Sequence, residues 1–115
     1  MNTLEKYKVS FYIHSALGKR LKTINDWLSL YIWDHYDLTL ANLLFNEVNS
    51  VVNGEKRNGG WDTQSLYLAK ITKNTTKIYK DLYDWEENNN IAPDFELPTS
   101  DFKVIVEAWR DFLAK

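Results

Sequence analysis

The last third of the chain contains an apolar pattern that constrains the fold more than any other feature of the sequence. Large apolar residues recur there every three or four positions, which places them on one face of a helix. They are Phe102, Ile105, Val106, Trp109, Phe112 and Leu113. Pro98 ends the preceding element, and Thr99 or Ser100 is expected to cap the first amide groups. Asp101 adds a negative charge at the positive end of the helix dipole. A stripe this wide has to be covered, most simply by a sheet that precedes it.

The segments before Pro98 supply candidate strands for that sheet. Residues 66–72 and 76–82 are rich in β-formers and flank Lys73-Asn74-Thr75, a pattern that predicts a hairpin. Residues 95–97 can add a short edge strand. Near the N-terminus, residues 7–13 alternate apolar and polar side chains, which indicates another strand with one apolar face.

Two helices are expected between the first strand and the hairpin. The stripe Ile24, Trp27, Leu28, Tyr31 and Ile32 follows Thr23 and has helical spacing, although residues 28–33 could also form a buried strand. A second stripe, from Leu40 to Val52, stops at Asn53-Gly54, which suits a left-handed cap. The sequence therefore predicts an α+β fold, in which a small antiparallel sheet packs against these two helices and the C-terminal helix.

Length and composition limit the class of protein. The chain of 115 residues, 44% hydrophobic, suits one domain, residues 1–115. It has no cysteine, no apolar signal core and no apolar run long enough for a bilayer, so we expect a cytoplasmic protein without membrane contact. A pI near 5.6 argues against direct binding to nucleic acid.

Acidic residues are concentrated near the C-terminal helix. The segment from Asp81 to Asp101 has seven carboxylates and no Lys or Arg, so it carries a charge of −7. The other nine carboxylates face all 14 basic residues, which leaves the rest of the chain at +5. Charge segregated in this way is typical of a surface that meets a basic partner, although it can also be only a solvated face.

Trp85 is the aromatic residue within this acidic segment. It is flanked by Asp84, Glu86 and Glu87, and an exposed Trp ringed by carboxylates would suit a hot spot against a basic protein. The alternative is that Trp85 ends the strand and turns inward. The predicted partner-binding residues are Asp81, Tyr83, Asp84, Trp85, Glu86, Glu87, Asp94 and Glu96, with Trp33, Asp34 and Tyr36 as a second group.

Signatures of catalysis or of cofactor binding do not occur. His14 and His35 have no metal-ligand spacing, and each is expected at the surface. Gly59-Gly60 lacks the pattern of a phosphate-binding loop, so flexibility is the expected role. We expect no metal site, no cofactor and no enzyme activity, with a hydrolase that uses Asp84, Glu86 or Glu87 as a remote alternative.

The order of predicted elements, together with the segments SFYIHS, NDWLSLYIWDHYDL, GGWDTQSL and the helix around residues 106–109, resembles immunity proteins of bacterial contact-dependent growth inhibition systems. The resemblance implies a cytoplasmic binder that neutralises the toxic domain of a cognate toxin, often a nuclease. An acidic surface that occludes a basic active site agrees with that implication. A small adaptor or structural domain is the alternative, and a monomer is the expected free state.

Overall fold

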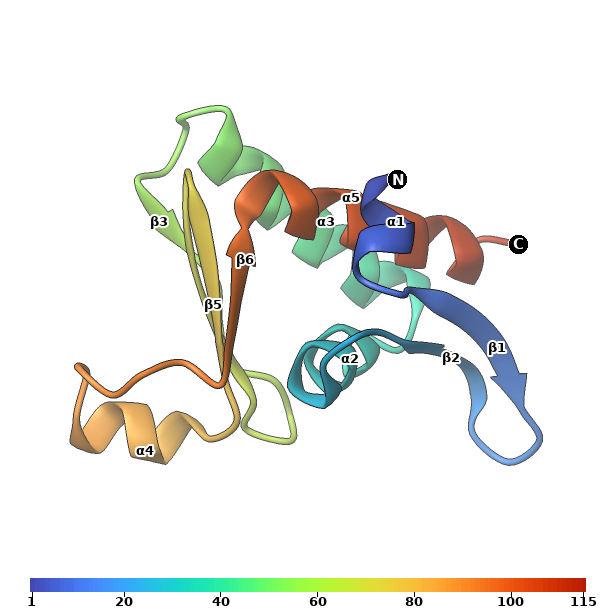
Figure 1. Cartoon of the computed structure of the whole chain (residues 1–115), viewed down its shortest axis with the longest axis horizontal. Coiled ribbons are helices and arrows are strands. Elements are labelled where there is room, and N and C mark those ends of the chain that lie inside the picture. The colour runs from blue at the N-terminus through green and yellow to red at the C-terminus, as the bar shows by residue number, and fades with distance from the viewer.

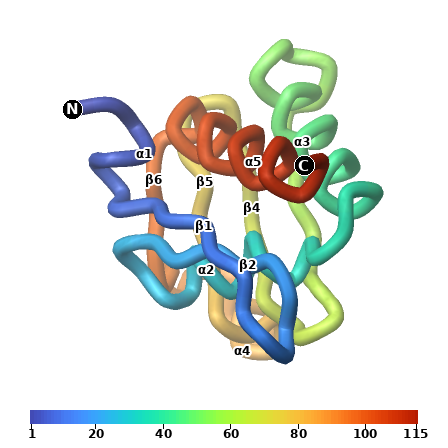
Figure 2. The backbone as a smooth tube through the Cα atoms, turned by 90° about the vertical axis from the view of Figure 1, so that its right-hand side faces the viewer, coloured from blue at the N-terminus to red at the C-terminus, as the bar shows by residue number.

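A computed structural model describes all residues, 1–115, and has an α+β fold with two antiparallel sheets. Figures 1 and 2 show the longer helices and the smaller sheet together on one side of the larger sheet, with the short helix α4 (Leu82–Glu87) on its other side. In chain order the elements are α1 (Thr3–Lys6), β1 (Ser10–His14), β2 (Gly18–Lys22), α2 (Asp26–Trp33), α3 (Leu38–Val52), β3 (Asn58–Gly59), β4 (Leu68–Thr72), β5 (Thr75–Tyr79), α4 (Leu82–Glu87), β6 (Phe95–Pro98) and α5 (Thr99–Leu113). None of the helices combines the length and the hydrophobicity that a membrane span requires.

The four-stranded sheet has the order β3-β4-β5-β6, and all its pairs are antiparallel. The predicted hairpin is therefore confirmed as β4 and β5, and the predicted edge strand as β6. Ala69, Ile71 and Ile78 point from this sheet into the core, while Lys70 and Lys77 alternate onto the opposite face. The second strand ends at Tyr79 and not at residue 82, because the chain turns into α4 there.

Helix α5 has the predicted apolar face. Phe102, Ile105, Val106 and Trp109 are completely buried, while Phe112 and Leu113 are partly exposed at the end of the stripe. The predicted cap is wrong, because the helix begins at Thr99 and no side chain caps it. The Thr99 hydroxyl donates instead to the Thr72 carbonyl oxygen (2.6 Å), so it ties the helix to the sheet.

Helices α2 and α3 both begin with a side-chain cap. Asn25 accepts hydrogen bonds from the amide groups of residues 27 and 28, and Asp37 accepts one from the amide of Leu40. The helical interpretation of residues 26–33 is thus confirmed and the buried strand is not formed. The end of α3 is also as predicted, since Gly54 follows it with a φ of +80°.

The N-terminal strand does not join the predicted sheet. β1 pairs only with β2, and the two form a separate hairpin. The strand starts later than the alternation suggested, because Tyr7 closes α1 and Lys8 has a φ of +53°. The hairpin packs on α5 through Phe11, whose ring stacks on those of Trp109 and Phe112, whereas Ile13 is 72% exposed near the hairpin turn.

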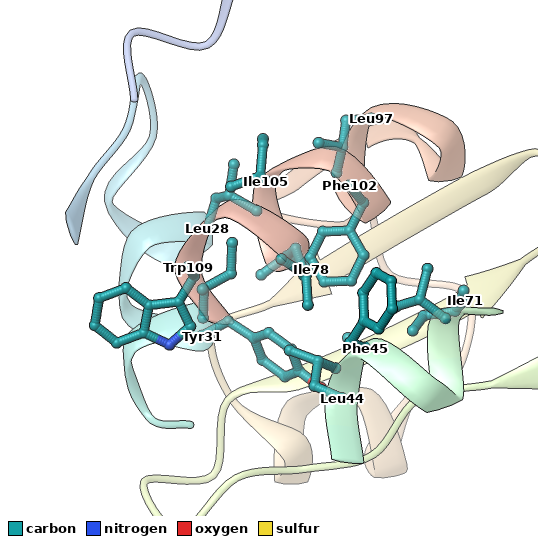
Figure 3. Packing of buried hydrophobic residues seen from close by; sticks show 14 of the residues in the cluster. Leu28, Tyr31, Leu44, Phe45, Ile71, Ile78, Leu97, Phe102, Ile105 and Trp109 are labelled. Carbon is teal, nitrogen blue, oxygen red and sulfur yellow. The ribbon is translucent and has the colours of Figure 1, made fainter. Parts of the chain in front are cut away.

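The core lies between the larger sheet and helices α2, α3 and α5. Figure 3 shows Phe102 of α5 and Phe45 of α3 meeting Ile78 and Ile71 of the sheet, with Trp109 beside α2. Eighteen buried residues form this one cluster, so the whole chain is organised around a single core.

Candidate interaction surface and pocket

Helix α4 holds most of the predicted partner-binding residues. Asp81 caps it, because its carboxylate accepts a hydrogen bond from the amide of Tyr83 (2.8 Å). The amide of Leu82 donates to the carbonyl oxygen of Leu66 (2.8 Å), so the start of the helix is fixed to the loop before β4. This six-residue helix lies on the face of the sheet opposite the core helices, as Figure 1 shows at the lower left.

The side chains of α4 form a surface that we call the α4 surface: Tyr83, Asp84, Trp85, Glu86 and Glu87. Asp84, Glu86 and Glu87 are exposed, and none of the chain's four ion pairs involves them. Tyr83 is 59% exposed. Three unpaired carboxylates thus stand beside an exposed aromatic ring on one short, capped helix.

Trp85 matches neither of the two sequence interpretations fully. Its side chain is half-buried and lies outside the core cluster, and the Lys70 ammonium group stands 4.4 Å from the centre of its ring. A cation at this distance from an indole face is attracted by the ring quadrupole. Trp85 therefore packs α4 onto the outer face of the sheet and leaves one part of its ring accessible.

Trp85→Ala is expected to lower the free energy of unfolding by about 1–2 kcal/mol, because it removes half-buried apolar area and the contact with Lys70. Tyr83→Ala serves as the matched control and should change stability by about 0.5 kcal/mol or less, as most surface substitutions do. Urea unfolding of the two variants measures both values. A loss in Trp85→Ala as large as about 3–5 kcal/mol would show that the ring belongs to the core.

The other acidic residues of the segment have more local roles. Asp94 accepts a hydrogen bond from the amide of Lys80 (2.8 Å), which fixes it at the end of β5 next to the start of α4. Glu96 lies on β6 directly opposite Lys77, so a basic residue stands beside it. Asp101 accepts a hydrogen bond from the Tyr7 hydroxyl (2.7 Å). Side-chain hydrogen bonds therefore hold Asp81, Asp94 and Asp101, whereas the carboxylates of Asp84, Glu86 and Glu87 on α4 accept none.

The structure separates the second predicted group. Trp33 is half-buried beneath Arg20, whose guanidinium carbon lies 4.1 Å from the ring centre, and its indole donates to the Lys19 carbonyl oxygen (3.3 Å). Asp34 is 5% exposed and Tyr36 is 51% exposed, and both line a pocket whose lining does not include Trp33. Trp33 thus helps to hold the β1–β2 hairpin and does not lie in the pocket.

This pocket has a volume of about 500 Å³ and lies between the α2–α3 connection, the first half of α3 and the loop after β3. Its lining residues are Asp34, His35, Tyr36, Leu40, Leu43, Trp61, Asp62, Thr63 and Gln64. The volume is within the range of about 300–1,000 Å³ that is usual for ligand pockets. The pocket was not predicted, although the sequence contains one signal of it. Trp61 directly follows Gly59-Gly60, and a glycine pair allows a close approach of the backbone that fixes the position of the next ring.

His35 is a buried residue, so its predicted surface position is wrong. It is 4% exposed, its Nδ1 lies 3.0 Å from the Tyr31 carbonyl oxygen, and its Nε2 accepts a hydrogen bond from the Trp61 indole (3.0 Å). Because Nε2 is an acceptor, the proton of the neutral ring is on Nδ1. The carbonyl oxygen of His35 accepts a further hydrogen bond from the Trp109 indole (2.9 Å). His35 therefore joins α2, the loop after β3 and α5.

Burial lowers the pKa of His35 below 6.5, and this effect outweighs the backbone hydrogen bonds and the charge of Asp34, which raise it. The unfolded chain thus binds a proton more readily than the folded one. Stability contributed by neutral His35 is fully present above pH 6.5 and is lost as the pH falls below that value.

Unfolding free energies measured from pH 7.5 to 5.5 should therefore decrease toward acid, with a slope of at most about 1.4 kcal/mol per pH unit. His35→Asn should remove most of this slope as well as lowering stability. His14→Gln, in which His35 is intact, should keep it. An unchanged slope in His35→Asn would assign the pH dependence to other groups.

No three His, Asp or Glu side chains come together in an arrangement that could hold a metal ion. Comparisons with protein-family models, curated proteins and solved structures found no match to this chain. The α4 surface and the pocket are the two candidate sites of interaction.

Proposed function

We propose that this protein is an immunity protein, which binds a cognate toxin domain in the cytoplasm and neutralises it by covering a basic active site. The toxin we propose is a nuclease, because an active site that holds phosphate groups is positively charged. The observation that carries the proposal is the set of unpaired carboxylates at Asp84, Glu86 and Glu87 beside the exposed ring of Tyr83. The resemblance of the sequence to immunity proteins supports the same function.

The proposed inhibition depends on the carboxylates of α4, which complement a basic partner and are held on a rigid helix. The capping bond of Asp81 and the backbone bond from Leu82 to Leu66 hold α4 in place before any partner arrives, so binding would cost little ordering of this helix. Its carboxylates would speed the encounter with a basic protein, and its aromatic rings would slow dissociation. No chemical step is required, since the bound protein excludes the substrate.

Co-purification tests the proposed function directly. The protein encoded immediately upstream of this gene, produced together with this protein, should form a complex with it that weakens as salt is raised. The free toxin domain should be toxic, and toxicity should disappear when both are produced. An upstream protein that neither binds nor harms cells would favour the alternative of an adaptor domain.

Reversal of charge on α4 is expected to separate binding from folding. The triple variant Asp84→Lys, Glu86→Lys and Glu87→Lys should keep the fold and slow association with the basic toxin domain by at least about tenfold at low salt. The control variant Glu5→Lys, Glu55→Lys and Glu107→Lys changes the net charge equally at exposed positions outside the α4 surface. Equal association rates for the two triple variants would mean that only net charge matters and that α4 is not the binding surface.

A further inference from the structure

We propose that the pocket between the α2–α3 connection and Trp61 receives an arginine side chain of the partner protein. This inference rests on the proposed function and adds a second, more specific contact to the α4 surface. It starts from the charge of the pocket, whose lining includes Asp34 and Asp62 and no Lys or Arg.

Asp34 is the first argument for a cation. Its side chain is 5% exposed, yet it takes part in none of the chain's ion pairs. One carboxylate oxygen accepts a single long hydrogen bond from the amide of Ser65 (3.3 Å). A buried carboxylate without a cationic partner is costly, so a positive charge that enters the pocket would be attracted to a group that the chain itself leaves unpaired.

The walls of the pocket favour arginine over lysine. The Trp61 ring is held by its hydrogen bond to His35, and the Trp61 carbonyl oxygen accepts another from the Tyr31 hydroxyl (3.0 Å). A fixed indole beside carboxylates suits a planar guanidinium, which stacks on aromatic faces and donates several hydrogen bonds in one plane. A compact, strongly hydrated ammonium group would use these features less well.

The rim of the pocket indicates that the arginine belongs to a protein. Tyr36 is 51% exposed and Leu43 is 53% exposed, and both line the pocket. When apolar side chains surround a charged pocket, a partner surface that covers them excludes water from the side chain anchored in the pocket. The arginine would therefore enter from a surface that also covers these side chains.

The pocket and the α4 surface are connected by one loop, residues 61–67. Trp61, Asp62, Thr63 and Gln64 line the pocket, and the carbonyl oxygen of Leu66 accepts the hydrogen bond from Leu82 at the start of α4. The loop that lines the pocket therefore also fixes the start of α4. Charge on α4 would govern the encounter, and the pocket would select a partner with arginine at one position.

An NMR titration with N-acetyl-L-arginine amide tests the pocket without any toxin. The indole N–H resonance of Trp61, assigned by its loss in Trp61→Phe, should shift in a saturable way. The probe N-acetyl-L-citrulline amide has nearly the same shape without the charge, and it should leave the resonance in place. Asp62→Asn should weaken binding of the arginine probe by about fivefold, the upper end for an exposed ion pair, whereas Asp26→Asn, outside the pocket, should not.

The outcomes distinguish this inference from the proposed function. Equal binding of both probes, or no saturable shift of Trp61, would overturn the arginine pocket while the complex with the toxin domain could still form. Conversely, a specific arginine response together with no binding of the upstream protein would refute the proposed function and leave the pocket's chemistry in place. If a complex forms, Asp62→Asn should speed its dissociation more than Asp26→Asn does.

Discussion

Trp109→Ala is expected to lower the free energy of unfolding by about 3–5 kcal/mol, the usual range for a large aromatic residue in a core. Its side chain is completely buried, and its indole donates a hydrogen bond to the carbonyl oxygen of His35 (2.9 Å). The substitution would leave a large cavity between α5, α2 and the β1–β2 hairpin. Because small domains are stable by only about 5–15 kcal/mol, this loss could be most of the total. Urea unfolding followed by circular dichroism measures it.

The control Trp109→Phe separates packing from hydrogen bonding. It retains most of the apolar volume but leaves the buried His35 carbonyl without this donor, so we expect a loss of about 1–3 kcal/mol, smaller than that of the alanine variant. Equal losses in the two variants would show that the hydrogen bond dominates. An unchanged midpoint in Trp109→Ala would contradict the central position of this ring in the core.

Gly60→Ala should be nearly as damaging, with an expected loss of about 3 kcal/mol or more. Gly60 has a φ of +99°, and an added β-carbon would overlap the carbonyl oxygen of Ala69, a backbone atom of the larger sheet. Its amide also donates to a Glu47 carboxylate oxygen (3.0 Å). Gly60 is thus a site of close backbone approach that places Trp61, and the predicted role in flexibility is wrong.

Gly54→Ala is the matched control for Gly60→Ala. Gly54 has a similar φ of +80°, but an added β-carbon would meet nothing within 4 Å. Its expected cost is only the conformational one, about 1 kcal/mol. If the two variants lose equal stability, the effect comes from the backbone angle, and the contact with Ala69 is unimportant.

The sequence predicts well those elements in which local pattern and tertiary environment agree. The stripe from Phe102 to Trp109 is buried as its spacing indicates, and α3 ends at Asn53-Gly54 as its cap chemistry indicates. The β4–β5 hairpin and the β6 edge strand are also found. In each case the apolar residues recur with the period of the element, about 3.6 residues in a helix or 2 in a strand, and so lie on one buried face.

Elements that depend on distant partners were missed. The strand β2 contains only one buried side chain, Leu21, and its sequence is otherwise polar, so no alternation marks it. The short helix α4 follows directly on a strand and is stabilised by Asp81 and by the remote carbonyl of Leu66. Neither element has a hydrophobic period of its own, so only tertiary contacts decide its conformation.

The candidate site was predicted only in part, because tertiary contacts also decide which of its polar residues are buried or hydrogen-bonded. Asp84, Glu86 and Glu87 are exposed and unpaired on α4, whereas Asp94 and Asp101 are used in hydrogen bonds that no local pattern shows. His35 was expected at the surface, yet it accepts hydrogen bonds from the indoles of Trp61 and Trp109, both remote in sequence. Burial of a single polar residue is set by long-range contacts, which one sequence does not reveal.

The central position of α5 has a consequence for how the protein is made. The helix supplies the largest buried side chain and lies between α3 and the β1–β2 hairpin, yet it follows every other element of the fold in chain order. At rates of about 5–20 residues per second, synthesis of the domain takes roughly 6–23 s, and the core cannot close before Trp109 has emerged. Partly synthesised chains would therefore expose apolar surface and depend on chaperones. If the proposed function holds, protection begins only after the core has closed around α5, so a cell would need a standing pool of folded molecules before toxin arrives.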